Sequence, residues 1–378
     1  MAENAEAQLS PEAFEEEAPP RSISQLMWRR FCRNRWAYWS LWVIGALYVM
    51  MAFSDFIAPH LPADVSRGYR MMPPTHVHLR DQDGSWHRPF VYRAGASRLD
   101  KITFLMAYPE DTSQRFPIRF FVAGVPHRAL GFLWTTTLHL WGTGDPTVPV
   151  FVMGTDGFGR DMFSRILYGS RVSLSIGMVG VFLTIIFGSL LGVTSGYYGG
   201  TVDILMQRLI EIIQAIPTLP LWLALAAIVP ATWSSVATYF MITIILSLIG
   251  WTGLARSLRG MTLRLRQSDL VVAARCIGAS DWRIIVRHIM PYNTSLIVVS
   301  ATLSIPGTIM GETGLSFLGL GIRPPMVSWG VLLAQAQNIN NVAFHPWLMW
   351  PAVFLIVAVL AFNFVGDGVR DATDPYTH

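Results

Sequence analysis

Apolar residues in this chain gather into long blocks, separated by shorter segments rich in arginine, glycine and proline. The blocks that we expect to form helices are residues 36–56, 172–197, 209–229, 236–254, 295–320 and 347–365. Each block is close to the roughly 20 residues that an apolar helix needs to cross about 30 Å of lipid. The pattern therefore predicts an all-α membrane protein with six transmembrane helices.

Helix-breaking residues interrupt the third and the fifth block. The third contains Pro217 and Pro220, and the fifth contains Pro306 and several glycines. One hypothesis is ordinary kinks, which a bundle tolerates because neighbouring helices satisfy the freed backbone groups. The other is a pair of broken helices that line a translocation path. The sequence keeps both hypotheses open.

Three polar residues in the fifth block, Glu312, Thr313 and Ser316, are candidates for lining such a path. A charged side chain inside a span costs roughly 2.5–3.5 kcal/mol on insertion scales, so Glu312 should face protein or water. It either lines the path, pairs with a cation such as Arg208, or caps backbone amides at a helix break. For Glu211 we favour a local pair with Arg208, three residues away.

Arginines before the first block predict the orientation of the chain. Arg29, Arg30, Arg33 and Arg35 precede this block, and such clusters mark the cytoplasmic side. Six spans then return the C-terminus to the cytoplasm. Between the first two spans, residues 57–150 are rich in proline, arginine and aromatic residues, and must lie outside the cytoplasm.

This topology divides the chain into segments. They are a disordered cytoplasmic tail at 1–27, the first transmembrane helix with its basic lead at 28–56, a small extracytoplasmic insertion at 57–150, a permease core with five transmembrane helices at 151–366 that includes a cytoplasmic coupling loop at 256–291, and a cytoplasmic tail at 367–378. Within the insertion, short runs such as residues 119–122 have a β-like pattern.

Composition supports a membrane protein and excludes other classes. The chain is 52% hydrophobic and only 14% charged, whereas a soluble domain carries about 25% charged residues. We attribute the net charge of +4 to the positive-inside bias rather than to nucleic-acid binding. Cys32 and Cys276 fall in segments placed in the cytoplasm, so we expect free thiols. No phosphate-binding loop, metal-ligand spacing or catalytic triad is present, so we expect no catalysis, no metal and no cofactor bound by this chain.

The segment that follows the fourth block, residues 269–291, is short, basic and rich in small residues. Ser268 or Asp269 can cap one short helix, and Gly278 can end it. Ser280 can cap a second helix that runs to Pro291. Two short helices that meet at a glycine on the cytoplasmic side would form a docking knob for a partner. The candidate coupling residues are Leu270, Val271, Val272, Ala273, Ala274, Arg275, Gly278, Ala279, Ser280 and Asp281.

An alternative role for this basic region is to lie on anionic lipid. We expect that role for the arginines that precede the knob, which are Arg256, Arg259, Arg264 and Arg266. For the knob itself we favour docking, because its small residues permit close approach of another backbone, whereas a helix that lies on lipid favours bulky apolar residues.

The knob resembles the cytoplasmic signature loop of the membrane-spanning subunits of bacterial ABC importers. That signature is a Glu-Ala-Ala triplet, a glycine and a later hydrophobic-X-Pro, and this chain has Ala273, Ala274, Gly278, Ile289 and Pro291 at the matching places. Val272 stands where the family often has Glu. This change removes a charge that could pair with a partner and leaves the shape of the loop unaffected.

A second segment, residues 153–174, reads MGTDGFGRDMFSRILYGSRVSL. It predicts a glycine-rich turn before a helix, in which Asp156, Asp161, Arg165 and Arg171 knit the start of the second span together or contact a substrate-delivering partner. The motif resembles the second permease of dipeptide and oligopeptide importers. Residues 196–216, 312–325 and 366–375 share that resemblance. The outer loop is much longer than in common members of the family.

This resemblance implies a type I ABC importer permease fold in the bacterial inner membrane. It implies the permease subunit of an ATP-driven, binding-protein-dependent importer, with di- and oligopeptides as substrates. The implied partners are a second homologous permease, two ATPase subunits that carry ATP and Mg, an extracytoplasmic substrate-binding protein and the lipid bilayer. Oligosaccharides such as α-galactosides, opines and nickel chelates are alternative substrates in the same class. A secondary transporter and a membrane receptor are the alternatives from other classes.

Overall fold

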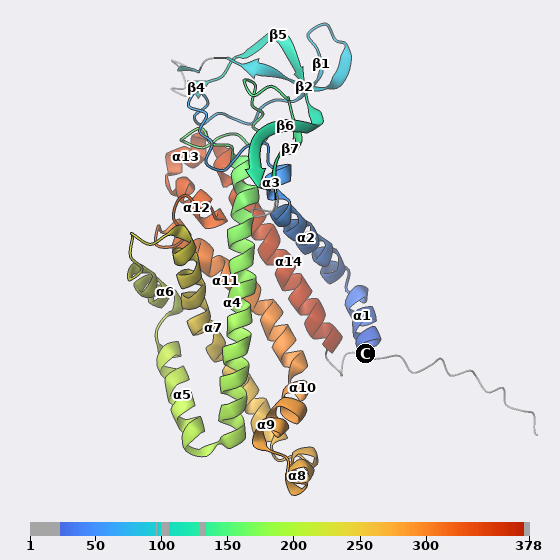
Figure 1. The fold of residues 1–378 in the computed structure, drawn as a ribbon, viewed down its shortest axis with the longest axis vertical. Coiled ribbons are helices and arrows are strands. Elements are labelled where there is room, and N and C mark those ends of the chain that lie inside the picture. The colour runs from blue at the N-terminus through green and yellow to red at the C-terminus, as the bar shows by residue number, and fades with distance from the viewer. Residues whose placement is uncertain (1–22, 96, 100–105, 129–133, 374–378) are drawn as a thin grey trace, which may run out of the picture.

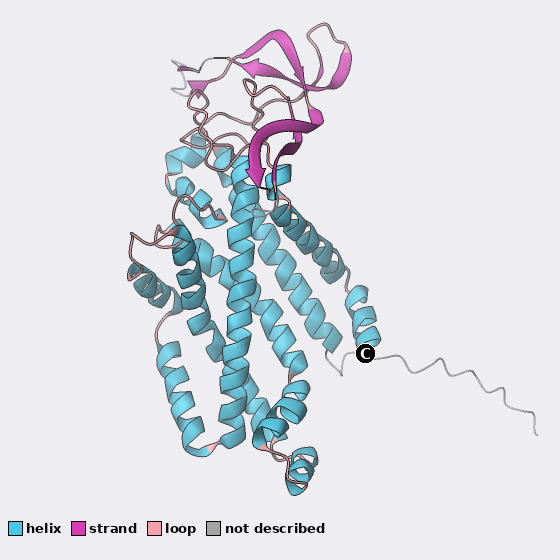
Figure 2. Cartoon of the chain, viewed as in Figure 1, coloured by secondary structure: helices cyan, strands magenta, loops and turns pink. Residues whose placement is uncertain are grey.

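Long helices run side by side along most of the molecule, and strands gather at one end (Figures 1 and 2). The computed structural model describes residues 23–95, 97–99, 106–128 and 134–373. Most of the tail predicted at 1–27 and part of the tail predicted at 367–378 lie outside the described residues.

The helices and strands alternate in blocks that follow the sequence pattern. The helices are α1 (Ile23–Arg33), α2 (Arg35–Ala52), α3 (Ser54–Ile57), α4 (Met162–Tyr198), α5 (Gly200–Ala215), α6 (Thr218–Ala227), α7 (Ser235–Leu265), α8 (Asp269–Cys276), α9 (Asp281–Ile284), the π-helix η2 (Ile285–Ile289), α10 (Met290–Tyr292), α11 (Thr294–Phe317), α12 (Trp329–Leu333), η3 (Ala334–Gln337), α13 (Ile339–Phe344), η4 (Pro346–Met349) and α14 (Trp350–Thr373). The strands are β1 (His78–Arg80), β2 (Trp86–Ala94), β3 (Arg98–Leu99), β4 (Met106–Ala107), β5 (Glu110–Pro117), β6 (Arg119–Arg128) and β7 (Thr135–Gly142).

Four helices of the described chain are long and apolar enough to cross a membrane: α4, α7, α11 and α14 with its lead η4. The pair α5 and α6 is a fifth candidate, bent by 87° at a short break. Six spans were predicted. The helix at the first predicted span, α2, is 18 residues long and starts at Arg35. Its aromatic residues favour the membrane interface over the bilayer centre, which explains why α2 does not belong to this set.

Two of the predicted helix breaks have different outcomes. The third span does break, because Ile216 is extended between α5 and α6 and Pro217 is the N-cap of α6. Of the two hypotheses for the fifth span, a break at Pro306 is wrong, since α11 continues as one helix from Thr294 to Phe317 with that proline inside. Such a proline inside a membrane helix is tolerated where neighbouring groups satisfy the freed backbone carbonyl.

Close backbone packing joins the two longest helices. α4 has 37 residues and is about 55 Å long at 1.5 Å per residue. Its Gly192 lies against the backbone of Ala255 on α7, where an added Cβ would be 2.5 Å from the carbonyl oxygen. One turn further, Gly196 meets the backbone of Arg259 in the same way. Small residues at such crossings let membrane helices approach closely, so α4 and α7 form the centre of the bundle.

Strands occupy the region between the first and second predicted spans. They form a three-stranded antiparallel sheet in the order β1-β2-β5 and the two hairpins β3-β4 and β6-β7. The β-like run predicted at 119–122 lies within β6 and is confirmed. A small core of Val91, Val148 and Val150 supports the sheet. All-α therefore describes the helical bundle, and the segment outside it is β.

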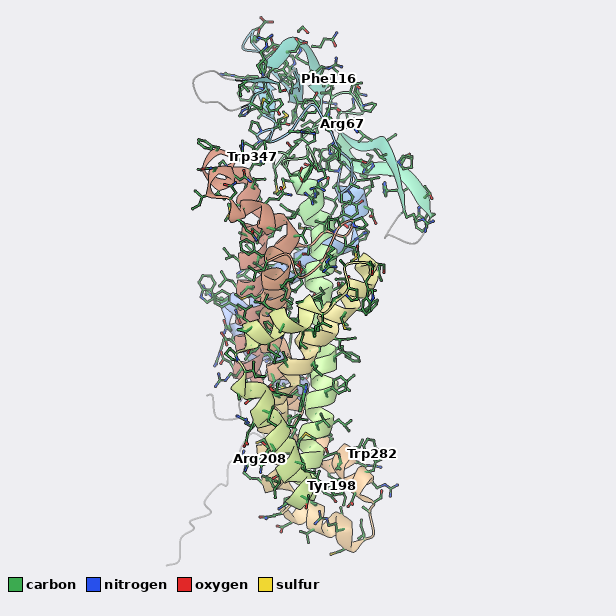
Figure 3. The ribbon with its side chains drawn as sticks, turned by 90° about the vertical axis from the view of Figure 1, so that its left-hand side faces the viewer. Arg67, Phe116, Tyr198, Arg208, Trp282 and Trp347 are labelled. Carbon is green, nitrogen blue, oxygen red and sulfur yellow. The ribbon has the colours of Figure 1, made fainter. Side chains whose placement is uncertain are left out.

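The strands and the coupling segment lie at opposite ends of the helical bundle. In Figure 1 the sheets stand above the helices, whereas α8 and α9 are at the far end. Figure 3 shows the same separation in side chains, with Phe116 and Arg67 at one end and Tyr198 and Trp282 at the other. Nδ2 of Asn34 donates to Oδ2 of Asp371 at 3.4 Å, so segments near the two ends of the described chain lie together.

Candidate functional site

The predicted coupling knob is the short helix α8 and the turn that follows it (Figure 1). Ser268 occupies the N-cap position with extended backbone. Its hydroxyl donates to the carbonyl of Leu265 at 2.7 Å instead of capping the helix. Asp269 is in the first turn of α8, where a carboxylate is favourable next to the positive end of the helix dipole.

Gly278 ends α8, as the sequence predicts. Its φ is +79°, a left-handed conformation that glycine adopts without steric cost. The amide of Ala279 donates to the carbonyl of Ala274 at 3.0 Å, and the amide of Gly278 donates to that of Arg275 at 2.9 Å. These two bonds form a Schellman motif, which turns the chain sharply into α9 and gives the knob a fixed shape.

The predicted coupling residues divide into an inner and an outer set. Val271 and Ala274 are buried and pack in a cluster with residues of α4, α7 and α9. Exposed members of the predicted set are Leu270, Val272, Ala273, Arg275, Gly278, Ser280 and Asp281, and Ala279 is partly buried. Ile277, which the prediction omitted, is 85% exposed at the tip. An exposed apolar surface of this kind is typical of a protein contact.

Tyr197 was missed by the sequence analysis, and it joins the knob to the bundle. It is buried at the end of α4, and its hydroxyl donates to Oδ1 of Asp281 at 2.7 Å. The guanidinium of Arg275 lies 5.1 Å from the centre of its ring. One side chain thus contacts both short helices of the knob. The only sequence signal was an aromatic pair before Gly199 and Gly200 at the end of a predicted span.

A salt bridge on the same side joins α5 to α7. Nε and Nη2 of Arg259 donate to the two carboxylate oxygens of Asp203, each at 2.5 Å. Ser195 on α4 donates to the same carboxylate at 2.7 Å. The prediction that Arg259 lies on lipid is therefore wrong. Its guanidinium is held instead in a bidentate pair with the carboxylate of Asp203.

The second helix of the knob does not end at Pro291. α9 passes into the π-helix η2 and then into α10, which contains Pro291, and α11 begins two residues after α10 ends. Proline lacks an amide hydrogen and its ring clashes with the carbonyl four residues earlier in a regular helix. A π-turn immediately before it provides the necessary space, so the chain stays helical.

Glu312 lies fully buried between α4, α11 and α12. Its Oε2 accepts a hydrogen bond from Ser173 at 3.0 Å, and its Oε1 accepts one from Ser316 at 2.7 Å. Each serine hydroxyl in turn accepts from a backbone amide: Trp329 donates to Ser173 at 3.1 Å, and Ile322 donates to Ser316 at 3.0 Å. The carboxyl group thus holds the loop between α11 and α12 through two serine relays.

This arrangement decides among the hypotheses for Glu312. Arg208 pairs with Glu211 at 2.8 Å, as predicted for Glu211, so the suggested pair of Glu312 with Arg208 is wrong. The hypothesis that Glu312 caps backbone amides is correct in outline. A serine hydroxyl lies between its carboxyl group and each of the two amides, those of Ile322 and Trp329. Thr313 and Ser316 are also buried, so the three candidate path residues face protein in this conformation.

Charged residues knit the start of α4, as the sequence predicts. Asp156 binds Arg160 at 2.7 Å and also pairs with Arg165. Burial disfavours ionisation of Asp156, but both arginines outweigh it and hold its pKa below the usual value. Arg171 binds both oxygens of Asp55 in α3, at 3.0 and 2.6 Å. Asp161 caps α4 by accepting from the amide of Ser164 at 3.0 Å.

Two further predictions concern the cysteines and metal binding. Cys32 and Cys276 are free cysteines. Within the described ranges, no group of three or more His, Cys, Asp and Glu residues could hold a metal ion.

Comparisons with known sequences identify a family for most of the chain. Residues 185–377 match the family described as binding-protein-dependent transport system inner membrane component. Residues 22–74 match the N-terminal TM domain of oligopeptide transport permease C. Together the two matches include the first helices, the coupling knob and the helical core from residue 185 of α4 onwards.

Individual relatives agree with these matches. The chain is 33% identical over 363 residues to the dipeptide transport system permease protein DppC of Lactococcus lactis, covering 94% of this chain and 92% of that protein. It is 42% identical over 223 residues to the oligopeptide transport system permease protein OppC of Haemophilus influenzae, covering 59% and 69% respectively. A glutathione transport system permease protein, GsiD of Pectobacterium atrosepticum, is 39% identical over 223 residues, covering 59% and 72%.

Among solved structures, the inward-facing methionine ABC transporter MetNI has a chain that matches with a TM-score of 0.44 at 19% identity. The match covers 56% of this chain and 98% of that chain.

Proposed function

Because the chain belongs to the family of inner membrane components of binding-protein-dependent transport systems, we propose that it is the permease subunit of an ATP-driven importer of dipeptides and oligopeptides. The observation that carries the substrate class is the match to a dipeptide transport system permease protein along 94% of this chain. Relatives named for oligopeptides and glutathione support the same class. None of these names favours oligosaccharides, opines or nickel chelates.

The proposed topology has six spans: α2, α4, the bent pair α5–α6, α7, α11 and α14. Both termini and the knob are cytoplasmic, and residues 57–150 are extracytoplasmic. Three observations support this assignment. Strands and knob lie at opposite ends of the bundle (Figure 1), the N-terminal helix α1 carries Arg29, Arg30 and Arg33, and the two ends of the described chain lie together.

The partners in this proposal are a second homologous permease, two ATPase subunits and an extracytoplasmic substrate-binding protein. ATP and Mg are bound by the ATPases, and this chain binds no cofactor. One ATPase docks on the exposed apolar tip of the knob. Closure of the ATPase pair moves α8 and α9, and the contacts of Tyr197 pass the movement to α4. Because α4 packs closely on α7, the two helices move as a unit and change the access of the path.

The Glu312 relay has a separate role in the proposal. It holds the loop between α11 and α12 at the end of the bundle that carries the strands (Figure 1). We place Glu312, Thr313 and Ser316 immediately behind the wall of the translocation path, where they keep its outer end in shape.

Docking on the knob is tested by copurification of the complete transporter. Ile277→Asp places a charge on the apolar tip without touching the interior of the chain, since this side chain is 85% exposed. Ile339→Asp is the matched control, because Ile339 is 82% exposed on α13 at the other end of the bundle. We expect the first variant to lose the ATPases while it keeps the second permease, and the control to keep both. Equal retention of the ATPases would contradict docking at the knob.

The substrate class is tested by uptake. A strain that lacks its own peptide importers would receive this chain with its three partner types, and accumulation of a labelled tripeptide would be measured. We expect accumulation that depends on ATP and on the binding protein, and competition by unlabelled di- and tripeptides. Accumulation driven by an ion gradient without ATP would instead support a secondary transporter.

A further inference from the structure

The hairpin β6-β7 presents large apolar side chains to solvent beside the outer end of the first membrane helix. Phe120 is 72% exposed, and Trp134, immediately before β7, is 68% exposed. Phe121 is also exposed, with a φ of +57°. That left-handed conformation is unfavourable for a bulky residue, and it breaks the usual alternation of side chains, so that two neighbouring phenylalanines are both accessible.

The base of this hairpin is fixed to the helical bundle. The ring of Phe121 lies 6.1 Å from the ring of Phe56 on α3. His139 on β7 is buried, and its Nδ1 is 2.7 Å from the carbonyl oxygen of Ala58. Since α3 follows α2 after a single residue, Phe53, these contacts hold the hairpin at the level where the first helix leaves the membrane.

Other exposed apolar residues lie at the end of α2 that leads to this hairpin. Val49, near the end of α2, and Phe53, which caps that helix, are both exposed, and Phe53 is three residues before Phe56, whose ring lies against Phe121. In Figure 1 the hairpin lies above α3, on the side of the bundle where α2 is outermost, and in Figure 3 the two strands project past the side of the helices. Arg119 and Arg128, at the two ends of β6, are exposed and can extend their guanidinium groups towards phosphate.

We propose that the hairpin β6-β7 is a membrane anchor, whose exposed aromatic face lies in the headgroup region of the outer leaflet around α2. Tryptophan and phenylalanine are the side chains that favour this region, where an apolar ring meets a polar boundary. The anchor would hold the extracytoplasmic segment flat against the membrane and away from the opening of the path. This inference rests on the proposed topology, which puts the strands outside the cytoplasm.

The depth of single spin labels tests the anchor in the assembled transporter. Cys32 and Cys276 are the cysteines of the chain and would be replaced by serine, and one new cysteine would be introduced at a time as Phe120→Cys, Trp134→Cys or Trp86→Cys. Trp86 is the matched control, because it is also 68% exposed but lies on β2 in the three-stranded sheet. The complex would be reconstituted in vesicles of phosphatidylethanolamine and phosphatidylglycerol.

Collisions with oxygen, which concentrates in lipid, would be compared with collisions with a water-soluble nickel chelate. We expect oxygen to dominate at positions 120 and 134 and the chelate to dominate at 86. Equal access of the chelate to all three labels would overturn the anchor. Protection of positions 120 and 134 from both reagents would also overturn it, since that result means contact with protein, such as the binding protein or the second permease.

Labelling of Trp86→Cys in intact spheroplasts separates this inference from the topology. Reaction with an impermeant maleimide before lysis places the strands outside, and a water-accessible hairpin then overturns the anchor alone. Reaction only after lysis would overturn the topology and, with it, the assignment to the outer leaflet.

Discussion

The hydroxyl of Tyr197, at the end of α4, donates a 2.7 Å hydrogen bond to Asp281, the first residue of α9. Arg275 of α8 lies over the same tyrosine ring. This one side chain therefore connects both short helices of the knob with the longest helix of the bundle. If the knob receives the ATPase, the Tyr197–Asp281 contact lies on a direct route from ATP to the path.

Tyr197→Phe tests this connection, because it removes the hydrogen bond and keeps the ring under Arg275. A hydrogen bond to a charged group contributes about 1.5–3 kcal/mol, so the coupling between knob and bundle should weaken by that order. We expect the ATPases to remain bound, while peptide uptake per ATP hydrolysed falls severalfold in proteoliposomes. Tyr198→Phe is the control, since that neighbouring side chain is exposed. An unchanged ratio in the Tyr197 variant would exclude this contact from coupling.

Glu312→Ala should destabilise the outer end of the bundle. It leaves the hydroxyls of Ser173 and Ser316 without their acceptor in a buried site, at a cost of about 1–3 kcal/mol for each unsatisfied group. We expect a lower temperature of thermal unfolding in detergent, and partial rescue by Glu312→Gln, which restores one acceptor.

Thr313→Val is the matched control for Glu312, because the buried hydroxyl of Thr313 has no hydrogen-bond partner among the described residues. Exchange of that hydroxyl for a methyl group of similar volume should leave thermal unfolding unchanged or raise its temperature. If Glu312→Ala were as stable as Thr313→Val, the serine relays would not contribute to the fold.

The sequence predicted those features that depend on local chemistry. Gly278 was expected to end α8 because glycine tolerates a left-handed backbone, and this is confirmed. For Pro217, which has no amide hydrogen, a kink and a break were both open, and the structure has a break. Pro306 also lacks an amide hydrogen and yet stays inside α11, where it is buried. The local pair of Arg208 with Glu211 was also predictable.

Long-range partners were not predictable in the same way. Tyr197 and Asp281 are 84 residues apart, and Ser173 and Glu312 are 139 apart. Nothing in the local sequence of either member indicates the other, since their proximity follows from how α4 packs against the later helices. The partner of Glu312 was therefore sought among cations, whereas the fold provides serine hydroxyls.

Gly192→Ala should disrupt the packing of α4 on α7. The added Cβ would lie 2.5 Å from the carbonyl oxygen and 2.7 Å from the Cα of Ala255, and backbone atoms cannot yield as a flexible side chain can. Overpacking typically costs about 1–3 kcal/mol, so we expect less assembled transporter after purification. Gly260→Ala is the control, because an added Cβ there meets nothing within 4 Å, and alanine is a better helix former than glycine by about 1 kcal/mol. Equal yields of both variants would contradict close packing at Gly192.

Acid should weaken the start of α4 through Asp156. Arg165 and Arg160 hold the pKa of this carboxyl below its usual value, so its stabilising effect is complete above the unfolded-state pKa of about 3.9. The effect is lost as the pH falls through the lower folded-state pKa. Thermal unfolding should therefore be insensitive to this group between about pH 5 and 8, and should become easier only in stronger acid.

Asp156→Asn removes the charge at every pH and should abolish the contribution of this group to the acid response. It leaves the buried Arg165 without its counter-charge, and breaking a buried pair in this way costs about 3–5 kcal/mol. Asp156→Asn combined with Arg165→Met removes both charges and should regain part of that loss, since the buried guanidinium is then absent. A double variant less stable than Asp156→Asn alone would mean that Arg165 stabilises the fold through its other contacts and not through the pair.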